Sequence, residues 1–140
     1  MVGATCGTCF YCNSGRENLC DRPVFTGYTR DGGYAGYAVA DARFCFPIPS
    51  GFSDFEAAPL LCAGITTYSP LRQAGCKPGD RVGVVGLGGL GHMAVKLAAS
   101  MGAEVTVLSS SESKEAAARA LGAHHFALTD GWLNRDEVRL

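Results

Sequence analysis

The sequence predicts an α/β fold in which a βαβαβ unit with a parallel sheet follows the end of a β-rich domain carrying a cysteine-rich lobe. Three observations lead to this expectation. A glycine-rich turn, Gly86-x-Gly88-x-x-Gly91, joins an apolar strand pattern to a helical pattern. Strand and helix patterns then alternate as far as residue 128. Near the start of the chain, four cysteines are clustered within residues 6–20.

The glycine turn begins the predicted α/β unit. Residues 81–85 have the pattern of a short apolar strand, and a helical pattern starts at Met93. In this context one glycine permits the tight turn, a second lets the backbone approach a pyrophosphate, and a third allows close packing of helix and strand. The free N–H groups of the first helical turn then bind phosphate oxygens. The turn therefore indicates dinucleotide binding, with a βα turn that binds no ligand as the alternative.

The α/β alternation continues beyond this turn. Residues 104–108 are expected to form a second strand, 112–121 a helix that ends at Gly122, and 124–128 a third strand. This order is one mononucleotide-binding half of a doubly wound, Rossmann-like sheet. Residues 129–140 are polar, and their pattern predicts no element.

The segment before the α/β unit changes from strand to helix patterns. Residues 24–29 and 34–39 flank a two-glycine turn and predict a hairpin, and 43–46 predict a further short strand. These strands are too few to close a sheet, so they suggest the end of a β-domain. Ser53 and Glu56 then form a capping-box pattern at the start of a helix.

Two prolines interrupt the helical patterns that follow Ser53. Pro59 predicts a kink or an early stop of the first helix. A second helix is expected over residues 65–74, ending at Gly75, with a possible kink at Pro70.

The early cysteines have the spacing Cys6-x2-Cys9-x2-Cys12-x7-Cys20. Four thiolates so close together can surround one tetrahedral Zn²⁺ ion, and a closed shell of four cysteines is a structural site. An iron–sulfur cluster is one alternative, although its usual run continues x3-Cys-Pro, which is absent here. Free or disulfide-bonded cysteines are the other. The spacing favours structural zinc.

Composition narrows the classes of function. The 140 residues are 47% hydrophobic and 18% charged with a formal net charge of -1, which supports a folded core and gives no support for nucleic acid or an anionic membrane as a partner. No apolar run approaches the ~20 residues of a membrane span, and residues 1–6 do not resemble an export signal. We therefore expect a cytoplasmic protein, in which seven cysteines serve metal binding rather than disulfides. Taken alone, Cys45, Cys62 and Cys76 are interpreted as core residues.

The end of the second predicted strand distinguishes between cofactors. An NAD-binding fold usually has Asp or Glu about 20 residues after the glycine motif, to bind the ribose 2′-hydroxyl. Here Ser109 occupies that point, followed by Ser110, Ser111 and Lys114. Hydroxyls and a cation accept a 2′-phosphate that a carboxylate would repel, so NADP is favoured over NAD. The alternative role for the serines is helix N-capping, and one serine can serve both purposes.

With these residues in place, the chain resembles the zinc-dependent medium-chain alcohol dehydrogenases, in particular their cinnamyl-alcohol-dehydrogenase-like, NADP-preferring aldehyde reductases. The resemblance runs from about residue 2 to residue 129. The segments that carry it are 6–20, 25–34, 59–68, 86–92 and 107–114. It implies a GroES-like domain with a zinc-binding lobe before the Rossmann-like half.

The resemblance also implies roles for individual residues. Cys62 would be one ligand of a catalytic zinc ion, and Thr66 would lie near the nicotinamide. The implied ligands of the structural zinc are Cys6, Cys9, Cys12 and Cys20. The residues implied to line the pyrophosphate are Gly86, Gly88, Gly89, Leu90 and Gly91. Those implied to hold the 2′-phosphate are Ser109, Ser110 and Lys114.

The implied reaction is hydride transfer between NADP(H) and a small primary alcohol or aldehyde, with zinc as a Lewis acid. A full-length relative is expected to be a homo-oligomer. The family's other catalytic zinc ligands, a cysteine and a histidine–glutamate pair, lie upstream of the zinc lobe, and this chain begins at that lobe. Its histidines, which are His92, His124 and His125, all belong to the nucleotide-binding half.

We therefore expect an internal fragment of such an enzyme. Its domains would be a partial GroES-like domain at 1–61 and the N-terminal half of an NADP-binding Rossmann domain at 62–140. The competing hypothesis is a truncated, non-catalytic remnant that binds zinc and nucleotide. A zinc-ribbon interaction domain would account for the first 20 residues and leave the βαβαβ unit unexplained.

Overall fold

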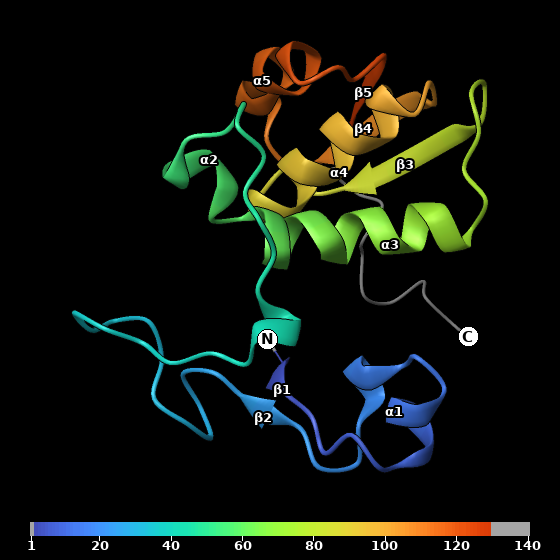
Figure 1. Cartoon of the computed structure of the whole chain (residues 1–140). Coiled ribbons are helices and arrows are strands. Elements are labelled where there is room, and N and C mark those ends of the chain that lie inside the picture. Colours follow the sequence, from blue (N-terminus) through green and yellow to red (C-terminus); the bar gives the residue numbers. More distant parts are fainter. Residues whose placement is uncertain (1, 130–140) are drawn as a thin grey trace, which may run out of the picture. The chain divides into compact units, whose positions relative to one another are not determined.

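The computed structural model describes residues 2–129 (Figure 1). The chain divides into two compact units, Met1–Phe52 and Ser53–Leu140, and each is described by itself. The expected domain boundary at 61/62 stays a prediction. The polar segment after Thr129 lies outside the described residues. Among the helices of residues 2–129, none combines the length and the apolar character that crossing a membrane requires.

A three-stranded parallel sheet forms the centre of the second unit. Its strands are β3 (Arg81–Val85), β4 (Glu104–Ser109) and β5 (His125–Leu128), and they lie in the order β3-β4-β5. Val84 pairs with Val107 across the first two strands. The predicted βαβαβ order and its parallel sheet are confirmed.

Helices connect the three strands and cover one face of the sheet. They are α4 (Gly89–Ser100), the 3-10 turn η4 (Glu112–Lys114) and α5 (Glu115–Ala120) (Figure 1). The helix predicted over 112–121 thus starts as a 3-10 turn. Gly102 and Gly122 follow the ends of α4 and α5 with φ angles of 80° and 106°, where L side chains are strained. The end predicted at Gly122 is therefore confirmed.

The core of this unit lies between the helices α4 and α5 and the face of β3 and β4 that these helices cover. Val95 of α4 and Val105 and Val107 of β4 are fully buried. Burial of a valine side chain contributes about 1.5 to 3 kcal/mol to stability. Val85, which points to the opposite face from Val84, is 76% exposed.

Three helical segments precede the sheet. The helix α2 (Asp54–Ala57) begins with the predicted capping box, in which the Ser53 hydroxyl accepts from the Glu56 N–H at 3.4 Å and the Glu56 carboxylate accepts from the Ser53 N–H at 2.9 Å. A π-helical turn, η3 (Leu60–Gly64), follows directly after Pro59. The Gly64 N–H bonds to the Pro59 carbonyl at 3.1 Å. The interruption expected at Pro59 is therefore present as a π-turn.

The helix α3 (Ile65–Gln73) continues through Pro70 as one element. Gly75, with a φ of 71°, follows its end, as predicted. Leu71 of α3 and Cys76 beyond it pack against the core of the α/β unit. The short helical segment that carries Cys62 is thus joined directly to a helix that is fixed by packing.

The first unit contains little regular structure. Its strands β1 (Val2–Ala4) and β2 (Val24–Phe25) pair antiparallel. Its helical segments are α1 (Phe10–Asn13) and the 3-10 turns η1 (Glu17–Leu19) and η2 (Ala42–Phe44).

The strand predictions in this unit were mostly wrong. The strand predicted over 24–29 is reduced to β2, and 34–39 form no strand, so the predicted hairpin is absent. A strand needs a partner for its backbone N–H and C=O groups, and Tyr34 and Tyr37 project fully into solvent. The segment 43–46 is also not a strand, because the Asp41 carboxylate accepts from the Arg43 N–H at 3.0 Å and caps a 3-10 turn.

Substitution at Gly91 tests the contact between α4 and β3. A Cβ on Gly91 would overlap the Gly86 carbonyl oxygen, which is backbone and cannot rotate away. We expect Gly91→Ala to destabilise the second unit by about 3 kcal/mol. Gly89→Ala is the control, since its Cβ would meet nothing within 4 Å, and it should leave stability equal or about 0.5 kcal/mol higher. Urea unfolding measures both, and equal stability of the two variants would contradict the assigned contact.

Candidate metal and cofactor sites

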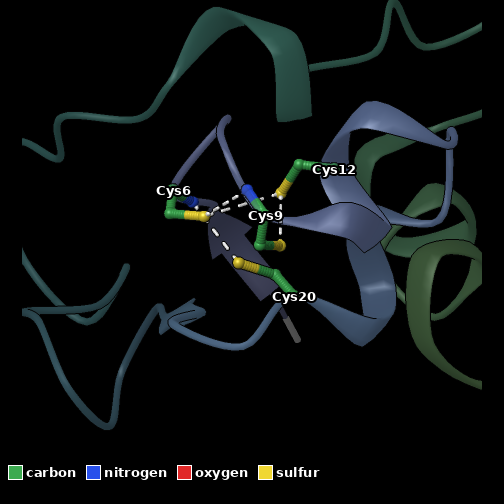
Figure 2. A group of neighbouring side chains, drawn as sticks. All are labelled: Cys6, Cys9, Cys12 and Cys20. Atoms are coloured by element: carbon green, nitrogen blue, oxygen red, sulfur yellow. Dashed lines mark hydrogen bonds between the residues drawn. The ribbon is translucent and has the colours of Figure 1, made fainter.

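Four cysteine sulfurs converge in the first unit, as Figure 2 shows. The thiols of Cys6, Cys9, Cys12 and Cys20 all lie within 4.8 Å of one another. The Cys9 and Cys12 sulfurs are 3.5 Å apart, and those of Cys6 and Cys12 are 3.9 Å apart. Tetrahedral coordination at the usual Zn–S length of about 2.3 Å requires sulfurs about 3.8 Å apart. The donor set therefore fits a single zinc ion.

Short backbone segments bring the four thiols together. Cys6 follows β1, Cys9 and Cys12 lie at the start and within α1, and Cys20 follows η1. Gly7 has a φ of 72°, which turns the chain between the first two cysteines. Backbone N–H groups point at the sulfurs, with Cys9 N–H donating to Cys6 Sγ at 3.4 Å and Arg22 N–H to Cys20 Sγ at 3.3 Å. These donors favour thiolates, the form that binds metal.

The surroundings of the four thiols shift their pKa values in different directions. Hydrogen bonding by the Thr8 backbone, followed by that of Cys9, lowers the pKa of the Cys6 thiol to about 5. The Asp21 backbone N–H is the main group that lowers the pKa of Cys9. Burial raises the pKa of Cys12 to about 11. Cys6 is therefore a thiolate at neutral pH without metal, whereas Cys12 must lose a proton on binding.

All seven cysteines are free thiols. Cys76 is half-buried against the core, as its interpretation as a core residue requires. Cys45 and Cys62 are exposed, so that interpretation was wrong for both. Cys45 instead donates from Sγ to the Asp41 carbonyl at 3.5 Å.

The glycine turn lies at the carboxyl end of β3, and its backbone is free of covering side chains. Gly86 has a φ of 84°, a conformation strained for other residues, and an added Cβ would meet nothing within 4 Å at Gly86, Gly88 or Gly89. Leu87, 3% exposed, anchors the turn in the core, while Leu90 is exposed. The turn thus has the open backbone that a pyrophosphate needs, and it leads into the twelve-residue helix α4.

His92 was not among the predicted site residues, but it belongs to this turn. Its Nδ1 lies 2.6 Å from the Gly88 carbonyl oxygen, and its backbone N–H donates to the same oxygen at 2.9 Å. A histidine four residues after the second glycine could have been identified as a neighbour on the helix. No sequence signal predicts the ring contact itself.

The serine-rich loop after β4 lies at the same edge of the sheet as the glycine turn. The Gly86 N–H donates to the Leu108 carbonyl at 2.8 Å, which joins the two strand ends. Ser110 and Lys114 are exposed, while Ser109 is only 4% exposed. The structure therefore places the predicted cofactor residues on two adjacent strand ends, as parallel pairing requires.

Cys62 and Thr66 lie one helical turn apart, on η3 and α3 respectively, and both are exposed. Within residues 2–129, the only group of three or more His, Cys, Asp or Glu side chains placed to hold a metal is the four-cysteine group. Cys62 therefore has no such group of partners among the described residues.

Comparison with known proteins identifies the class. Residues 1–50 match the family model of the alcohol dehydrogenase GroES-like domain, and residues 89–136 match that of the zinc-binding dehydrogenases. The chain is 48% identical to an alcohol dehydrogenase of Geobacillus stearothermophilus over 120 residues, which are 86% of this chain and 36% of the relative.

Solved structures give the same result. A cinnamyl alcohol dehydrogenase of Sorghum bicolor superposes with a TM-score of 0.86 at 42% identity, covering 94% of this chain and 40% of that one. The enzyme of that name from Helicobacter pylori, complexed with NADP(H), gives a TM-score of 0.82 at 39% identity, covering 90% and 39%.

The chain belongs to the zinc-dependent medium-chain alcohol dehydrogenases, with the cinnamyl alcohol dehydrogenases among its relatives. Its fold is that of their GroES-like and Rossmann-like domains. It spans about two fifths of the length of the relatives it matches.

The acidity of the cysteine group can be tested on the metal-free chain. Because the pKa of Cys6 is about 5 and that of Cys12 about 11, iodoacetamide at about pH 7 should label Cys6 first and leave Cys12 largely unmodified. Peptide mass spectrometry across a pH series measures both midpoints. In urea both thiols should approach the ordinary value of about 8.5. Labelling of Cys12 at a lower pH than Cys6 would show the assignment to be wrong.

Proposed function

We propose that this chain carries the structural zinc site and the first half of the NADP(H) site of an alcohol dehydrogenase or aldehyde reductase. The reaction would be hydride transfer between NADP(H) and a primary alcohol or aldehyde, in the cytoplasm, by a protein that is homo-oligomeric at full length. The observation that carries the proposal is a serine, not a carboxylate, at the end of β4 beside the open glycine turn.

Cys6, Cys9, Cys12 and Cys20 would hold the structural zinc. Their four sulfurs fill a tetrahedral shell and leave no position for a substrate, so the ion would stabilise the lobe rather than react. Cys6 is already ionised at neutral pH, which lowers the cost of forming the tetrathiolate.

The glycine turn would bind the cofactor's pyrophosphate, with Gly86, Gly88 and Gly89 giving access to the backbone and Gly91 fixing the helix against the strand. The loop after β4 would receive the 2′-phosphate. Ser110 and Lys114 are exposed there, and a hydroxyl with a cation suits a phosphate.

Bound NADP(H) supplies the hydride chemistry, and a catalytic zinc ion supplies Lewis-acid polarisation of the substrate oxygen. Cys62 would be one ligand of that zinc, and Thr66 on the following helix would face the nicotinamide. Both side chains are exposed on the same side of one helical turn. Their role would be to present a sulfur and a hydroxyl on that side of the helix.

A second candidate is a zinc- and nucleotide-binding protein without catalysis. It is favoured by the exposed Cys62, which has no metal-binding group of partners within residues 2–129. NADPH oxidation in the presence of an aldehyde separates the candidates. Turnover by the 140-residue chain that Cys62→Ser abolishes supports the enzyme, whereas zinc and NADPH binding without turnover supports the binding protein.

The structural zinc proposal predicts one zinc ion per chain, measured by native mass spectrometry. Cys20→Ala should lose it and lower the melting temperature of the lobe, because the metal's binding free energy stabilises the fold. Cys45→Ala is the matched control, since Cys45 lies outside the group, and it should retain the ion. Full zinc occupancy in Cys20→Ala would contradict the site.

The cofactor proposal predicts a charge-dependent preference. Lys114→Gln should weaken NADP⁺ binding about tenfold and leave NAD⁺ binding unchanged, because only NADP⁺ has a phosphate for the ammonium to contact. Lys96→Gln, an exposed lysine on α4, is the control and should bind as the unmodified chain does. Calorimetry of both nucleotides measures the ratio. An equal effect of the two substitutions would argue against the assigned phosphate site.

A further inference from the structure

A histidine side chain accepts a backbone hydrogen bond at the amino end of the parallel sheet. The Nδ1 atom of His124 accepts from the Val105 N–H at 3.1 Å, and the His124 N–H donates to the Val105 carbonyl at 2.8 Å. His124 directly precedes β5, whereas Val105 belongs to β4 and is fully buried. The ring nitrogen therefore serves this N–H as a carbonyl oxygen of the neighbouring strand does elsewhere in a parallel ladder.

This contact requires a neutral imidazole ring. Nδ1 accepts only while it carries no proton, so the proton of the neutral ring must be on Nε2. In imidazolium both nitrogens are donors, and protonation of His124 would place two N–H groups against each other. The Val105 N–H, in a buried residue, would then lack an acceptor, which is costly for a backbone donor.

The helix α5 does not supply a substitute acceptor. Arg119 of α5 donates from its guanidinium to the His124 carbonyl at 3.2 Å. The same guanidinium is paired with Glu115 at 2.7 Å. Arg119 thus fixes the backbone of His124 and leaves the ring contact with Val105 unchanged.

The neighbouring histidine responds to acid in the opposite direction. His125 Nε2 lies 2.6 Å from Glu104 Oε1, and this bond lowers the pKa of the Glu104 carboxyl, with smaller electrostatic contributions from Arg81 and His124. The carboxylate therefore stays charged where histidines take up protons, around pH 6.5, and protonated His125 forms an ion pair with it. Because both partners are exposed, this pair contributes less than the hydrogen bond of a buried N–H.

We propose that His124 is an acid-sensitive switch for the attachment of β5, in which the neutral ring holds the start of β5 to β4 and protonation of the ring releases it. Folding uses the neutral ring, so this stabilisation is complete at neutral pH. It is lost as the pH falls through the range in which histidines take up a proton, around 6.5. The effect is local to β5, because β3 and β4 are joined by a ladder of their own.

Native-state hydrogen exchange of the 140-residue chain, followed by NMR, tests this switch. The protection factor of the Val105 N–H, which is corrected for the intrinsic pH dependence of exchange, should fall about tenfold between about pH 7.5 and about pH 5.5. The Gly86 N–H, which donates to the Leu108 carbonyl at 2.8 Å, is the internal control and should keep its protection. At neutral pH, ¹⁵N NMR of the His124 ring should show the tautomer with its proton on Nε2.

Two substitutions separate the adjacent histidines. His124→Asn retains a side-chain acceptor that takes up no proton, so the protection of Val105 should become independent of pH. His125→Gln is the matched control, since it removes the neighbouring imidazole and retains a donor for Glu104, and it should show the same fall as the unmodified chain.

Four results would overturn the switch. Two of them come from the unmodified chain: equal protection of Val105 at both pH values, or a neutral His124 ring with its proton on Nδ1. A fall that persists in His124→Asn, or that His125→Gln removes, would assign the effect to another group. An equal loss of protection at Gly86 would show that acid unfolds the whole unit rather than releasing β5.

Discussion

The close approach of α4 to the end of β3 is the contact on which the α/β unit depends. Gly91 leaves no room for a side chain against the Gly86 carbonyl, and this proximity lets Val95 pack against β4 as part of the core. The same contact holds the start of α4 at the sheet edge where the loop after β4 begins. One steric constraint therefore determines both the stability of the unit and the position of its candidate cofactor site.

The first unit has the opposite character. Cys20 is the only buried residue among residues 2–52. Such a segment cannot rely on apolar burial, and four convergent thiols are the clearest source of stability that it contains. Metal binding converts directly into folding free energy in this situation.

Elements with a local signal could be predicted from the sequence. The glycine turn, the capping box at Ser53 and the alternating strands of the α/β unit depend on neighbouring residues, and the structure has them. The strand over 34–39 failed because pairing depends on a distant partner that local pattern does not reveal. For the candidate sites, cysteine spacing indicated the cluster, but the burial of Ser109 and the exposure of Cys62 depend on three-dimensional packing.

The order of the strands has a consequence for how the protein is made. Strands β3, β4 and β5 follow one another in the chain in the same order as in the sheet. During synthesis, each strand can therefore pair with the strand that left the ribosome just before it. The cysteine group spans only residues 6–20, and short loops close at small entropic cost. Both units therefore depend on contacts between segments that are close in the chain, so each can form in the order of synthesis.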